Sequence, residues 1–274
     1  RLVMPEYRAG GGSLAIPALA VVQNPQGALG FGGSLRAGGA LPGGLADGLV
    51  LPLSGHWSQA AGLTLWRDCA DVRFDRLVLG GARFEKRGVL LCPPAGGAIV
   101  RSDAHGTRIA AGTAGLDLAG HLGESPVRIR SGQLGFAVPG TLAARDLDVR
   151  LGPAGTESHF TLARLDARIG KDVAGRFTGA DVALNAVPLD LLDAAGDWRY
   201  AGGRLLLSNA QLTVEDRVKP GRFEPLTAQG ADLVLQDNVI TANALLANPK
   251  SGREVTRVAI VHDLGTAAGH ADLD

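Results

Sequence analysis

The sequence contains few aromatic residues. Phe, Trp and Tyr make up 4% of the 274 residues, whereas hydrophobic residues of all kinds make up 46%. The apolar content therefore comes mainly from Leu, Val and Ala, and the ring-rich core of an ordinary β-sandwich is not expected. Trp57, Trp66 and Trp198 do not cluster with basic residues, which argues against a stacking platform for bases or sugars.

The sequence also lacks an excess of charge of either sign. The 27 Lys and Arg residues balance 27 Asp and Glu residues, and the absence of a basic stripe argues against nucleic acid as a partner. No run of about 18 apolar residues occurs, and the N-terminus lacks the pattern of a signal peptide. We therefore expect the chain to be a fragment, with any membrane anchor or export signal outside it.

Motifs for nucleotide binding and nucleophilic catalysis are missing. Gly170-Lys171 continues into Asp172 and lacks the upstream glycine of a Walker loop. Ser13 and Ser34 follow glycines, but neither completes the G-x-S-x-G motif. We interpret both serines as turn residues.

Histidines and acidic pairs show no catalytic or metal-binding spacing. His262 precedes Asp263, but no second histidine follows three or four residues later. The pairs Glu215-Asp216 and Asp190/Asp193 have the composition of a glycosidase couple, yet turn and helix-start roles explain them more simply. We predict a non-enzymatic protein without a cofactor or a metal site.

Glycine and proline are plentiful, with 40 and 14 residues. Their share is below that of low-complexity disorder, so they are expected to separate structured segments. Gly152, Pro153 and Gly155 fall together and suggest a boundary between residues 1–152 and 153–274. One continuous unit is the alternative.

Apolar residues alternate along much of the chain, which predicts strands with one apolar and one solvated face. The alternating sets are Leu49/Leu51/Leu53, Val72/Phe74, Leu134/Phe136/Val138, Leu147/Val149/Leu151, Phe160/Leu162, Val182/Leu184, Leu205/Leu207, Leu212/Val214, Leu233/Leu235 and Val258/Ile260. Turn formers separate these sets and predict meandering hairpins. They are Gly80-Gly81, Gly96-Gly97, Gly152-Pro153, Gly202-Gly203, Ser208-Asn209, Asp237-Asn238 and Pro249 with Gly252.

Helical spacing is rare. Residues Pro188 to Ala195 place Leu191, Leu192 and Ala195 at helical spacing after a proline suited to a first turn. A second short helix is predicted from Pro42 to Leu49.

Cys69 and Cys92 flank two predicted strands and the Gly80-Gly81 turn. This arrangement places them at the open end of a hairpin, close enough for a disulfide, which would indicate an oxidising compartment. Two buried free thiols are the alternative. A zinc site is disfavoured because neither cysteine belongs to a C-x-x-C pair.

Three stretches combine strand patterns with Gly, Pro and Asp punctuation: PLDLLDAAGDWRYAGGRLLLSNAQLTVED (188–216), FEPLTAQGADLVLQDNVITANALLANPKSG (223–252) and VTRVAIVHDLGTAAGHADLD (255–274). Together they resemble the C-terminal part of the YdbH-type branch of the AsmA-like and TamB-like bacterial intermembrane phospholipid transport proteins. The block from Trp66 to Pro93, WRDC through VLLCP, is similar to the two-cysteine hairpin of that family.

The resemblance implies an all-β fold in which an elongated antiparallel sheet curls into a hydrophobic groove, with one or two short helices from the helical spacing above. Residues 1–152 would form the N-terminal part of this groove, with the two-cysteine hairpin, and residues 153–274 the C-terminal part. The positions expected to line it are Leu134, Phe136, Leu147, Val149, Leu205, Leu207, Leu212, Val214, Leu233, Leu235, Val258 and Ile260.

The implied function is a periplasmic bridge that conducts phospholipid between the inner and outer membranes of a Gram-negative bacterium. The resemblance further implies a parent protein anchored in the inner membrane and a small outer-membrane lipoprotein as a partner. Two alternatives stay open. One is a structural or adhesive β-solenoid, although no repeat of 20–50 residues is found. The other is a scaffold for outer-membrane protein assembly that pairs its sheet edge with other strands.

Overall fold

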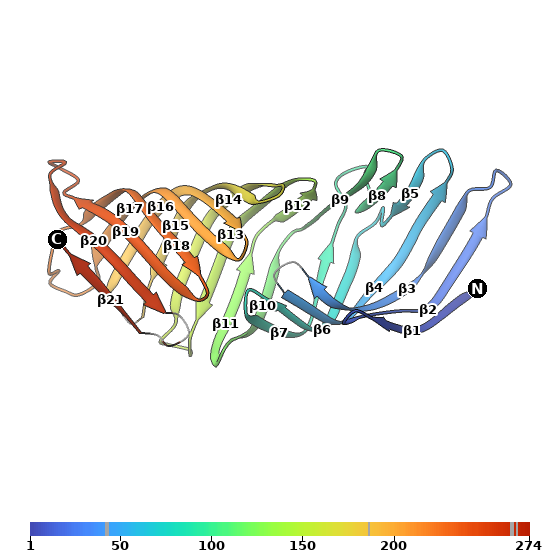
Figure 1. Ribbon diagram of the computed structural model, residues 1–274, viewed down its shortest axis with the longest axis horizontal. Coiled ribbons are helices and arrows are strands. Elements are labelled where there is room, and N and C mark those ends of the chain that lie inside the picture. The colour runs from blue at the N-terminus through green and yellow to red at the C-terminus, as the bar shows by residue number, and fades with distance from the viewer. Residues whose placement is uncertain (42–43, 186, 264–265, 267) are drawn as a thin grey trace. The chain divides into compact units, whose positions relative to one another are not determined.

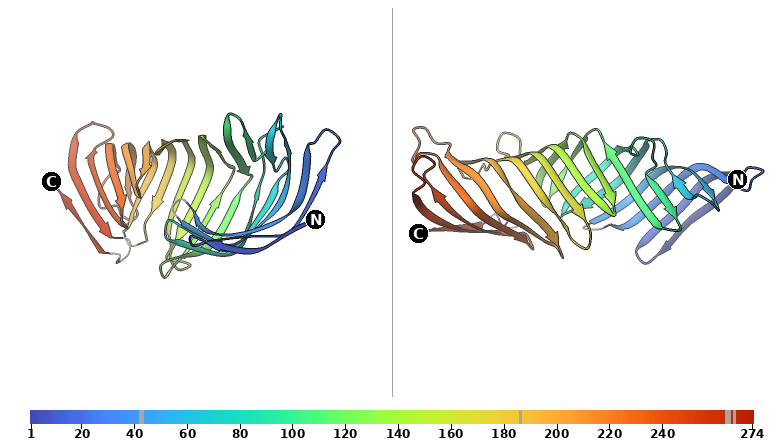
Figure 2. Two further views of the ribbon diagram at one scale, coloured as in Figure 1. Left: turned by 45° about the vertical axis from the view of Figure 1, so that its right-hand side comes forward. Right: turned by 90° about the horizontal axis from the view of Figure 1, so that it is seen from above.

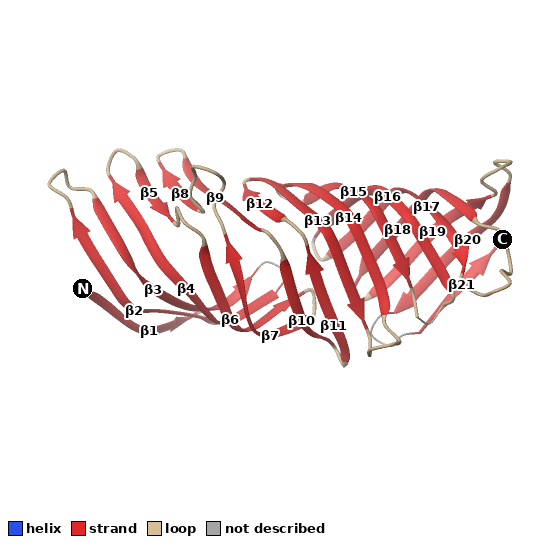
Figure 3. Ribbon diagram, turned by 180° about the vertical axis from the view of Figure 1, so that it is seen from behind, coloured by secondary structure: helices blue, strands red, loops and turns tan. Residues whose placement is uncertain are grey.

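The computed structural model describes residues 1–41, 44–185, 187–263, 266 and 268–274. These residues form 21 β-strands and no helix (Figures 1 and 3). The predicted all-β, antiparallel class is therefore confirmed. The described residues accordingly contain no helix of the length and hydropathy needed to cross a membrane.

The chain folds as two compact units. Unit 1 comprises Arg1–Glu124 and Gln133–Gly140, and unit 2 comprises Ser125–Gly132 and Thr141–Asp274. Gly152 and Pro153 lie in the connection between two strands of unit 2, and the division into residues 1–152 and 153–274 stays a prediction.

Unit 1 is built from hairpins that follow one another along the chain. Its strands are β1 (Leu2–Ala9), β2 (Gly12–Gln23), β3 (Leu29–Leu41), β4 (Gly44–Ser58), β5 (Gly62–Leu65), β6 (Ala70–Leu79), β7 (Ala82–Leu91), β8 (Val100–Asp103), β9 (Gly106–Thr113), β10 (Leu116–Leu122) and β12 (Leu134–Val138).

The ladder of unit 1 divides at β4. The first half of β4 pairs with β6, which continues to β7 and β10, and its second half pairs with β5, which continues to β8, β9 and β12. Trp66 lies at the division, where its backbone N–H donates to the carbonyl of Ser54 and its indole N–H to that of Pro52. Its own carbonyl accepts from Ile99, so this one residue connects β4 to the start of β8.

The disulfide Cys69–Cys92 joins the chain just before β6 to the chain just after β7, with 4.0 Å between the Cα atoms. Cys92 also exchanges backbone hydrogen bonds of 2.7 and 2.9 Å with Gly112 of β9. The disulfide was predicted at the open end of this hairpin. Together with the hydrogen bonds to Gly112, it also joins the two branches of unit 1, namely β6, β7 and β10 on one side and β5, β8, β9 and β12 on the other.

Unit 2 is a meander whose strands lie side by side and bend along their length, coloured from light green to red in Figure 2. Its strands are β11 (Ser125–Ser131), β13 (Gly140–Leu151), β14 (Ser158–Ile169), β15 (Val173–Ala183), β16 (Leu189–Ala201), β17 (Arg204–Asp216), β18 (Leu226–Gln236), β19 (Val239–Ala247), β20 (Glu254–Asp263) and β21 (Ala268–Leu273). From β14 to β21 each strand pairs with the next in antiparallel register.

A four-residue pattern recurs in five strands of unit 2: an Ala or larger apolar residue, any residue, then Asp, Asn or Gly, then Ala or Leu. These bulge tetrapeptides are Ala144–Leu147, Phe177–Ala180, Leu191–Ala194, Leu207–Ala210 and Ala228–Ala231. The third residue has a positive φ in each, namely Asp146 (49°), Gly179 (63°), Asp193 (50°), Asn209 (53°) and Gly230 (68°). Asp, Asn and Gly are the residues that tolerate this conformation best.

Each bulge tetrapeptide inserts one residue into the alternation. The pairing register shifts at Phe177–Ala180, Leu191–Ala194, Leu207–Ala210 and Ala228–Ala231. Because a one-residue shift exchanges the two faces of a strand, the first and fourth residues of each tetrapeptide point to the same side of the sheet. The bulges therefore bend the strands while keeping apolar residues on one face.

The two predicted helices are wrong. Residues 189–195 belong to β16 and residues 44–49 to β4, while Pro42 falls outside the described residues. The physical reason is the bulge: Asp193 adds a residue to the strand, so Leu192 and Ala195 lie three residues apart on one face, as Leu191 and Ala194 do on the other. A bulge in a strand thus reproduces the spacing of a helical turn.

Most predicted turns are confirmed, and one is wrong. Asp237 and Asn238, with φ of 51° and 64°, form the two-residue turn between β18 and β19, a conformation that suits the twist of a hairpin. Ser208-Asn209 lies inside β17 and bends that strand instead of ending it. The two alternating sets on either side of it, Leu205/Leu207 and Leu212/Val214, therefore belong to one strand.

Candidate functional site

One face of unit 2 is almost entirely apolar. Residues directly opposite each other in paired strands point to the same side of a sheet, so the pairing registers assign each residue to a face. Leu205 lies opposite both Tyr200 and Leu235, and Leu235 lies opposite Ile240, which shows how one row continues from β16 to β19.

We call this side the apolar face of unit 2. It consists of Val127 and Ile129 of β11; Ala144, Leu147, Val149 and Leu151 of β13; Phe160, Leu162, Leu165, Ala167 and Ile169 of β14; Val173, Phe177, Ala180 and Val182 of β15; Leu189, Leu191, Ala194, Trp198 and Tyr200 of β16; Leu205, Leu207, Ala210, Leu212 and Val214 of β17; Leu226, Ala228, Ala231, Leu233 and Leu235 of β18; Ile240, Ala242, Ala244 and Leu246 of β19; Val258 and Ile260 of β20; and Ala271 and Leu273 of β21.

The opposite side of the same strands carries most of the charged residues, and we call it the polar face. Arg176 donates to Asp197 across β15 and β16 at 3.0 Å, and Arg145 of β13 contacts Asp166 of β14 at 3.4 Å. These exposed ion pairs contribute little to stability, but they keep charge on one side of the sheet.

Asp148 and His159 connect β13 to β14 on the polar face at 2.9 Å. Partial burial raises the pKa of Asp148, but hydrogen bonds from His159 and Arg150 outweigh it and hold that pKa below its ordinary value. Because Asp148 is on the polar face, its neighbours Leu147 and Val149 point to the apolar face.

Small residues occupy the inside of the bend. Ala180, Ala194, Ala210, Ala231 and Ala244 follow one another from β15 to β19 along the row of bulges. The inside of a bent sheet has the least room for side chains, and Ala194, Ala210 and Ala231 are buried there at 7–8% exposure. Larger residues, among them Phe177, Leu207 and Leu212, pack on either side of these alanines.

Within the described residues of unit 2, no second layer covers the apolar face. No helix is present among those residues, and the large side chains along this face are mostly half-buried, with Ile260 38% and Tyr200 43% exposed. Extended apolar surfaces of this kind mark binding sites for apolar ligands, partners or membranes in soluble proteins.

Ten of the twelve residues predicted to line a groove lie on this face. They are Leu147, Val149, Leu205, Leu207, Leu212, Val214, Leu233, Leu235, Val258 and Ile260. The other two, Leu134 and Phe136, belong to β12 of unit 1, opposite Thr113 and Ala111 of β9. Phe136 packs there against the buried cluster of Ala70, Ile99 and Ala111.

Unit 1 has an apolar face of its own, built in the same way. Leu35 lies opposite Leu51 and Ala37 opposite Leu49, while Arg36 lies opposite Val50 on the other side. The alternating set Leu49, Leu51 and Leu53 therefore points to one face.

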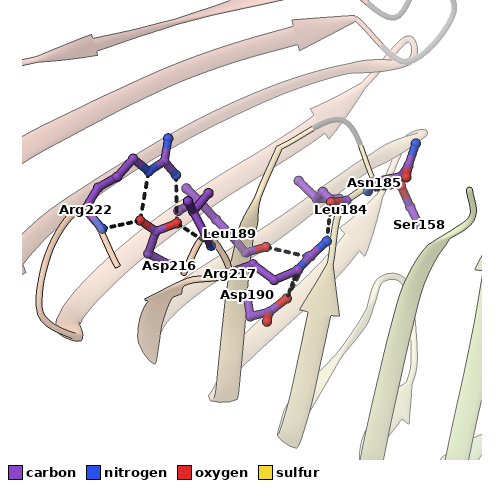
Figure 4. Close-up of polar contacts among 9 residues, drawn as sticks. Ser158, Leu184, Asn185, Leu189, Asp190, Asp216, Arg217 and Arg222 are labelled. Carbon is purple, nitrogen blue, oxygen red and sulfur yellow. Dashed lines mark hydrogen bonds and ion pairs between the residues drawn. The ribbon is translucent and has the colours of Figure 1, made fainter. Parts of the chain in front are cut away.

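Two arginines, Arg217 and Arg222, form ion pairs at one end of the strands of unit 2 (Figure 4), and we call them the arginine clasp. Asp216 ends β17 with its side chain only 1% exposed, and it accepts hydrogen bonds from Arg222 through Nε at 2.8 Å and Nη2 at 2.9 Å. The backbone N–H groups of Val218 and Arg222 also donate to it. The paired guanidinium holds the pKa of Asp216 far below its ordinary value.

The second arginine of the clasp is Arg217. It donates to Asp190 and to the carbonyls of Leu184, which follows β15, and Leu189, which begins β16. The loop between β17 and β18 is thus held against the neighbouring strand ends by two fully paired cations.

The acidic pairs considered for catalysis have structural positions. Asp190 pairs with Arg217 and Asp193 sits in a bulge, while Glu215 and Asp216 point to opposite faces of β17. The helix-start role expected for Asp190 and Asp193 is wrong, since both lie in a strand. The described residues contain no group of three or more His, Cys, Asp or Glu side chains arranged to hold a metal ion.

Comparison with known protein families decides the relationship of the chain. Residues 13–274 match the profile of the YdbH-like family, described as "Intermembrane phospholipid transport protein YdbH". The chain belongs to the YdbH-like family. No curated protein and no solved structure matches it.

Sequence reasoning missed the bulges of this YdbH-like chain, although they leave a readable signal. The combination of an apolar residue, then Asp, Asn or Gly two positions later, then Ala or Leu, recurs at corresponding places in five strands. Repetition of the pattern in successive predicted strands could have identified the bend. The arginine clasp left no comparable signal, because it depends on the conformation of a loop.

Proposed function

We propose that this chain is a non-enzymatic segment of a periplasmic bridge that conducts phospholipid between the inner and outer membranes along its apolar faces. The observation that carries the proposal is the uncovered apolar face of unit 2, which extends without a charged residue in its interior from β13 to β20. Membership of the YdbH-like family supports phospholipid as the cargo.

The physical case rests on the cost of exposing acyl chains to water. A two-tailed lipid exposes about 30 methylenes, each costing about 0.8 kcal/mol, or on the order of 24 kcal/mol in total. A continuous apolar face removes most of this cost. Its Leu, Val and Ala side chains offer a surface along which an acyl chain can move without a strongly favoured stopping place.

The proposal assigns the twelve predicted positions, among them Leu207 and Leu235, to the lining of the lipid path. It also places the parent protein in the inner membrane through a segment beyond this chain, with a small outer-membrane lipoprotein as its partner. The polar face, with its paired charges, would face water.

Site-specific photocrosslinking in cells tests the proposal. A photoreactive residue at Leu207 or Leu235, on the apolar face, should capture phospholipid. The matched controls are Leu206 and Val234, which are the adjacent apolar residues on the polar face and lie opposite each other.

Equal lipid labelling from both faces would contradict the proposal. Crosslinks to nascent outer-membrane proteins, in place of lipid, would select the assembly-scaffold alternative.

A further inference from the structure

The apolar face of unit 2 contains a hydrogen-bond donor that has no acceptor. This donor is the indole N–H of Trp198 on β16, whose Nε1 atom is buried and has no hydrogen-bond partner within the described part of the chain. Trp198 lies opposite Gly175 of β15 and opposite Leu207 of β17. Because Leu207 belongs to the apolar face, the pairing register places Trp198 on that face as well.

The residues beside Trp198 on this face supply no acceptor. The row that passes through Trp198 runs from Ala167 of β14 through Gly175 to Leu207 and then to Leu233 of β18, and each of these neighbours has an apolar side chain or none. The backbone carbonyls of paired strands accept from the adjacent strands in the ladder. Because Ala167 and Gly175 carry nothing larger than a methyl group, they also leave room beside the indole ring.

A second buried side-chain atom without a partner lies on the same face. It is Oγ of Ser131 at the end of β11. Ser131 continues the alternation of Val127 and Ile129, which belong to the apolar face. Buried polar groups of folded proteins are nearly always hydrogen-bonded, so an unpaired one calls for a partner or a function. Both such atoms among the residues that the structure describes lie on the face that we propose carries the ligand.

Trp198 lies one row in from the end of the apolar face. Two residues further along β16, the exposed Tyr200 pairs with Leu205 beside the Gly202-Gly203 turn. One such row spans about 7 Å along a strand. The indole is therefore close to the boundary between the apolar face and water, the position at which tryptophan and tyrosine are enriched in membrane proteins. Its side chain is partly exposed, so a ligand on the face can touch the ring.

We propose that Trp198 is a specificity-determining residue of the lipid path, and that its indole N–H donates to an ester carbonyl of a phospholipid whose acyl chains lie on the apolar face. The inference rests on the proposed function and names the class of lipid linkage that the face prefers. Ester carbonyls are the polar groups nearest to the acyl chains, and they accept hydrogen bonds without donating any, which matches an indole that only donates. The ring has to turn to bring its buried nitrogen to the ligand, and the room beside Gly175 permits this.

Ether-linked phospholipids separate this hydrogen bond from apolar contact. An ether lipid with the same headgroup and the same hydrocarbon chains makes the same contacts with the face but lacks the two carbonyl acceptors. The net contribution of one neutral hydrogen bond corresponds to about a fivefold difference in binding. The chain should therefore prefer the ester lipid by about this factor, and removal of the indole N–H should abolish the preference.

The test uses the full chain incubated with vesicles that contain equal amounts of ester-linked and ether-linked phosphatidylethanolamine with hydrocarbon chains of the same length. Lipid bound to the repurified protein is quantified by mass spectrometry. The test variant is Trp198→Phe, which keeps an aromatic ring and removes the donor. Its matched control, Tyr200→Phe, removes one donor from the same strand and the same face, at an exposed position where the hydroxyl can bond to water.

We expect the wild-type chain to bind about five times more ester lipid than ether lipid. Trp198→Phe should bind the two lipids equally and keep the wild-type amount of ether lipid, and Tyr200→Phe should keep the preference. An unchanged ratio in Trp198→Phe, including a loss of both lipids in equal proportion, would overturn the inference. So would an equal loss of preference in the two variants, or no preference in the wild-type chain. These results leave the proposed function standing, whereas absence of either lipid on the wild-type chain would overturn both.

Discussion

Leu207 of β17 lies directly opposite Leu233 of β18 on the apolar face, and the adjacent residues Leu206 and Val234 lie opposite each other on the polar face. Two neighbouring cross-strand pairs of similar size therefore differ mainly in the side of the sheet to which they point. This arrangement allows the two faces to be tested with the same substitutions.

The variant Leu207→Glu/Leu233→Glu should bind less than a tenth of the phospholipid that the wild-type chain binds. Each carboxylate would have to lose its hydration beneath an acyl chain, at a cost of several kcal/mol. Lipid that copurifies with the chain provides the measurement. Leu206→Glu/Val234→Glu should bind nearly as much as wild type, and circular dichroism should show that both variants keep their strands. Equal loss of lipid in the two variants would count against the assignment of faces.

Gly230→Val should lower the free energy of unfolding by about 1–2 kcal/mol, because a β-branched residue is strained at positive φ. No atom lies within 4 Å of the position that a Cβ would occupy there, so crowding does not contribute at that atom. Urea denaturation measures the change. Gly230→Asn should be nearly neutral, since asparagine already occupies the corresponding place at Asn209. If the asparagine variant were as unstable as the valine variant, backbone strain would not be the cause.

Asp216→Asn should destabilise the chain at pH 7 and make it less sensitive to acid. Because pairing with Arg222 lowers the pKa of Asp216 in the folded state, its stabilising effect is present above the unfolded pKa of about 3.9. That effect is lost as the pH falls through the lower, folded value. The difference in stability between wild type and variant should thus shrink below about pH 4 in urea titrations at several pH values. Glu215→Gln, on the neighbouring exposed residue, is the control and should show a much smaller difference throughout.

Reduction of Cys69–Cys92 should destabilise unit 1 by about 3 kcal/mol, the value expected for closing a loop of this length. Thermal unfolding with and without a reductant measures the loss. The variant Cys69→Ser/Cys92→Ser should show a similar loss and no response to the reductant. An unchanged unfolding temperature on reduction of the wild-type chain would contradict the role of the disulfide in joining the two branches at Gly112.

Period-two alternation was sufficient to predict the strands, because each strand has one apolar and one solvated side. It failed where a bulge interrupts the period: Leu191, Leu192 and Ala195 have helical spacing, and Ser208-Asn209 has the composition of a turn, yet both segments lie in strands. A single sequence segment does not separate these cases. The register of neighbouring strands does, because only in the paired sheet do the first and fourth residues of a bulge tetrapeptide lie on one face.

The positions expected to line a groove came from the same alternation together with the family resemblance, and the pairing registers place ten of them on one face of unit 2. The arginine clasp was not predicted. Arg217 and Arg222 reach Asp190 and Asp216 only through the conformation of the loop between β17 and β18, which leaves no periodic pattern in the sequence.

The curvature of the apolar face and its length are determined by different features of the sheet. The bend is set inside each strand, by four residues, whereas the extent of the sheet is set by how many strands follow one another. An inserted hairpin that carries two such tetrapeptides at the same distance from its turn would add two strands, or about 10 Å, without altering the cross-section. A protein built in this way can be matched to a wider or narrower space by duplication or loss of hairpins, while the surface presented to its ligand stays the same.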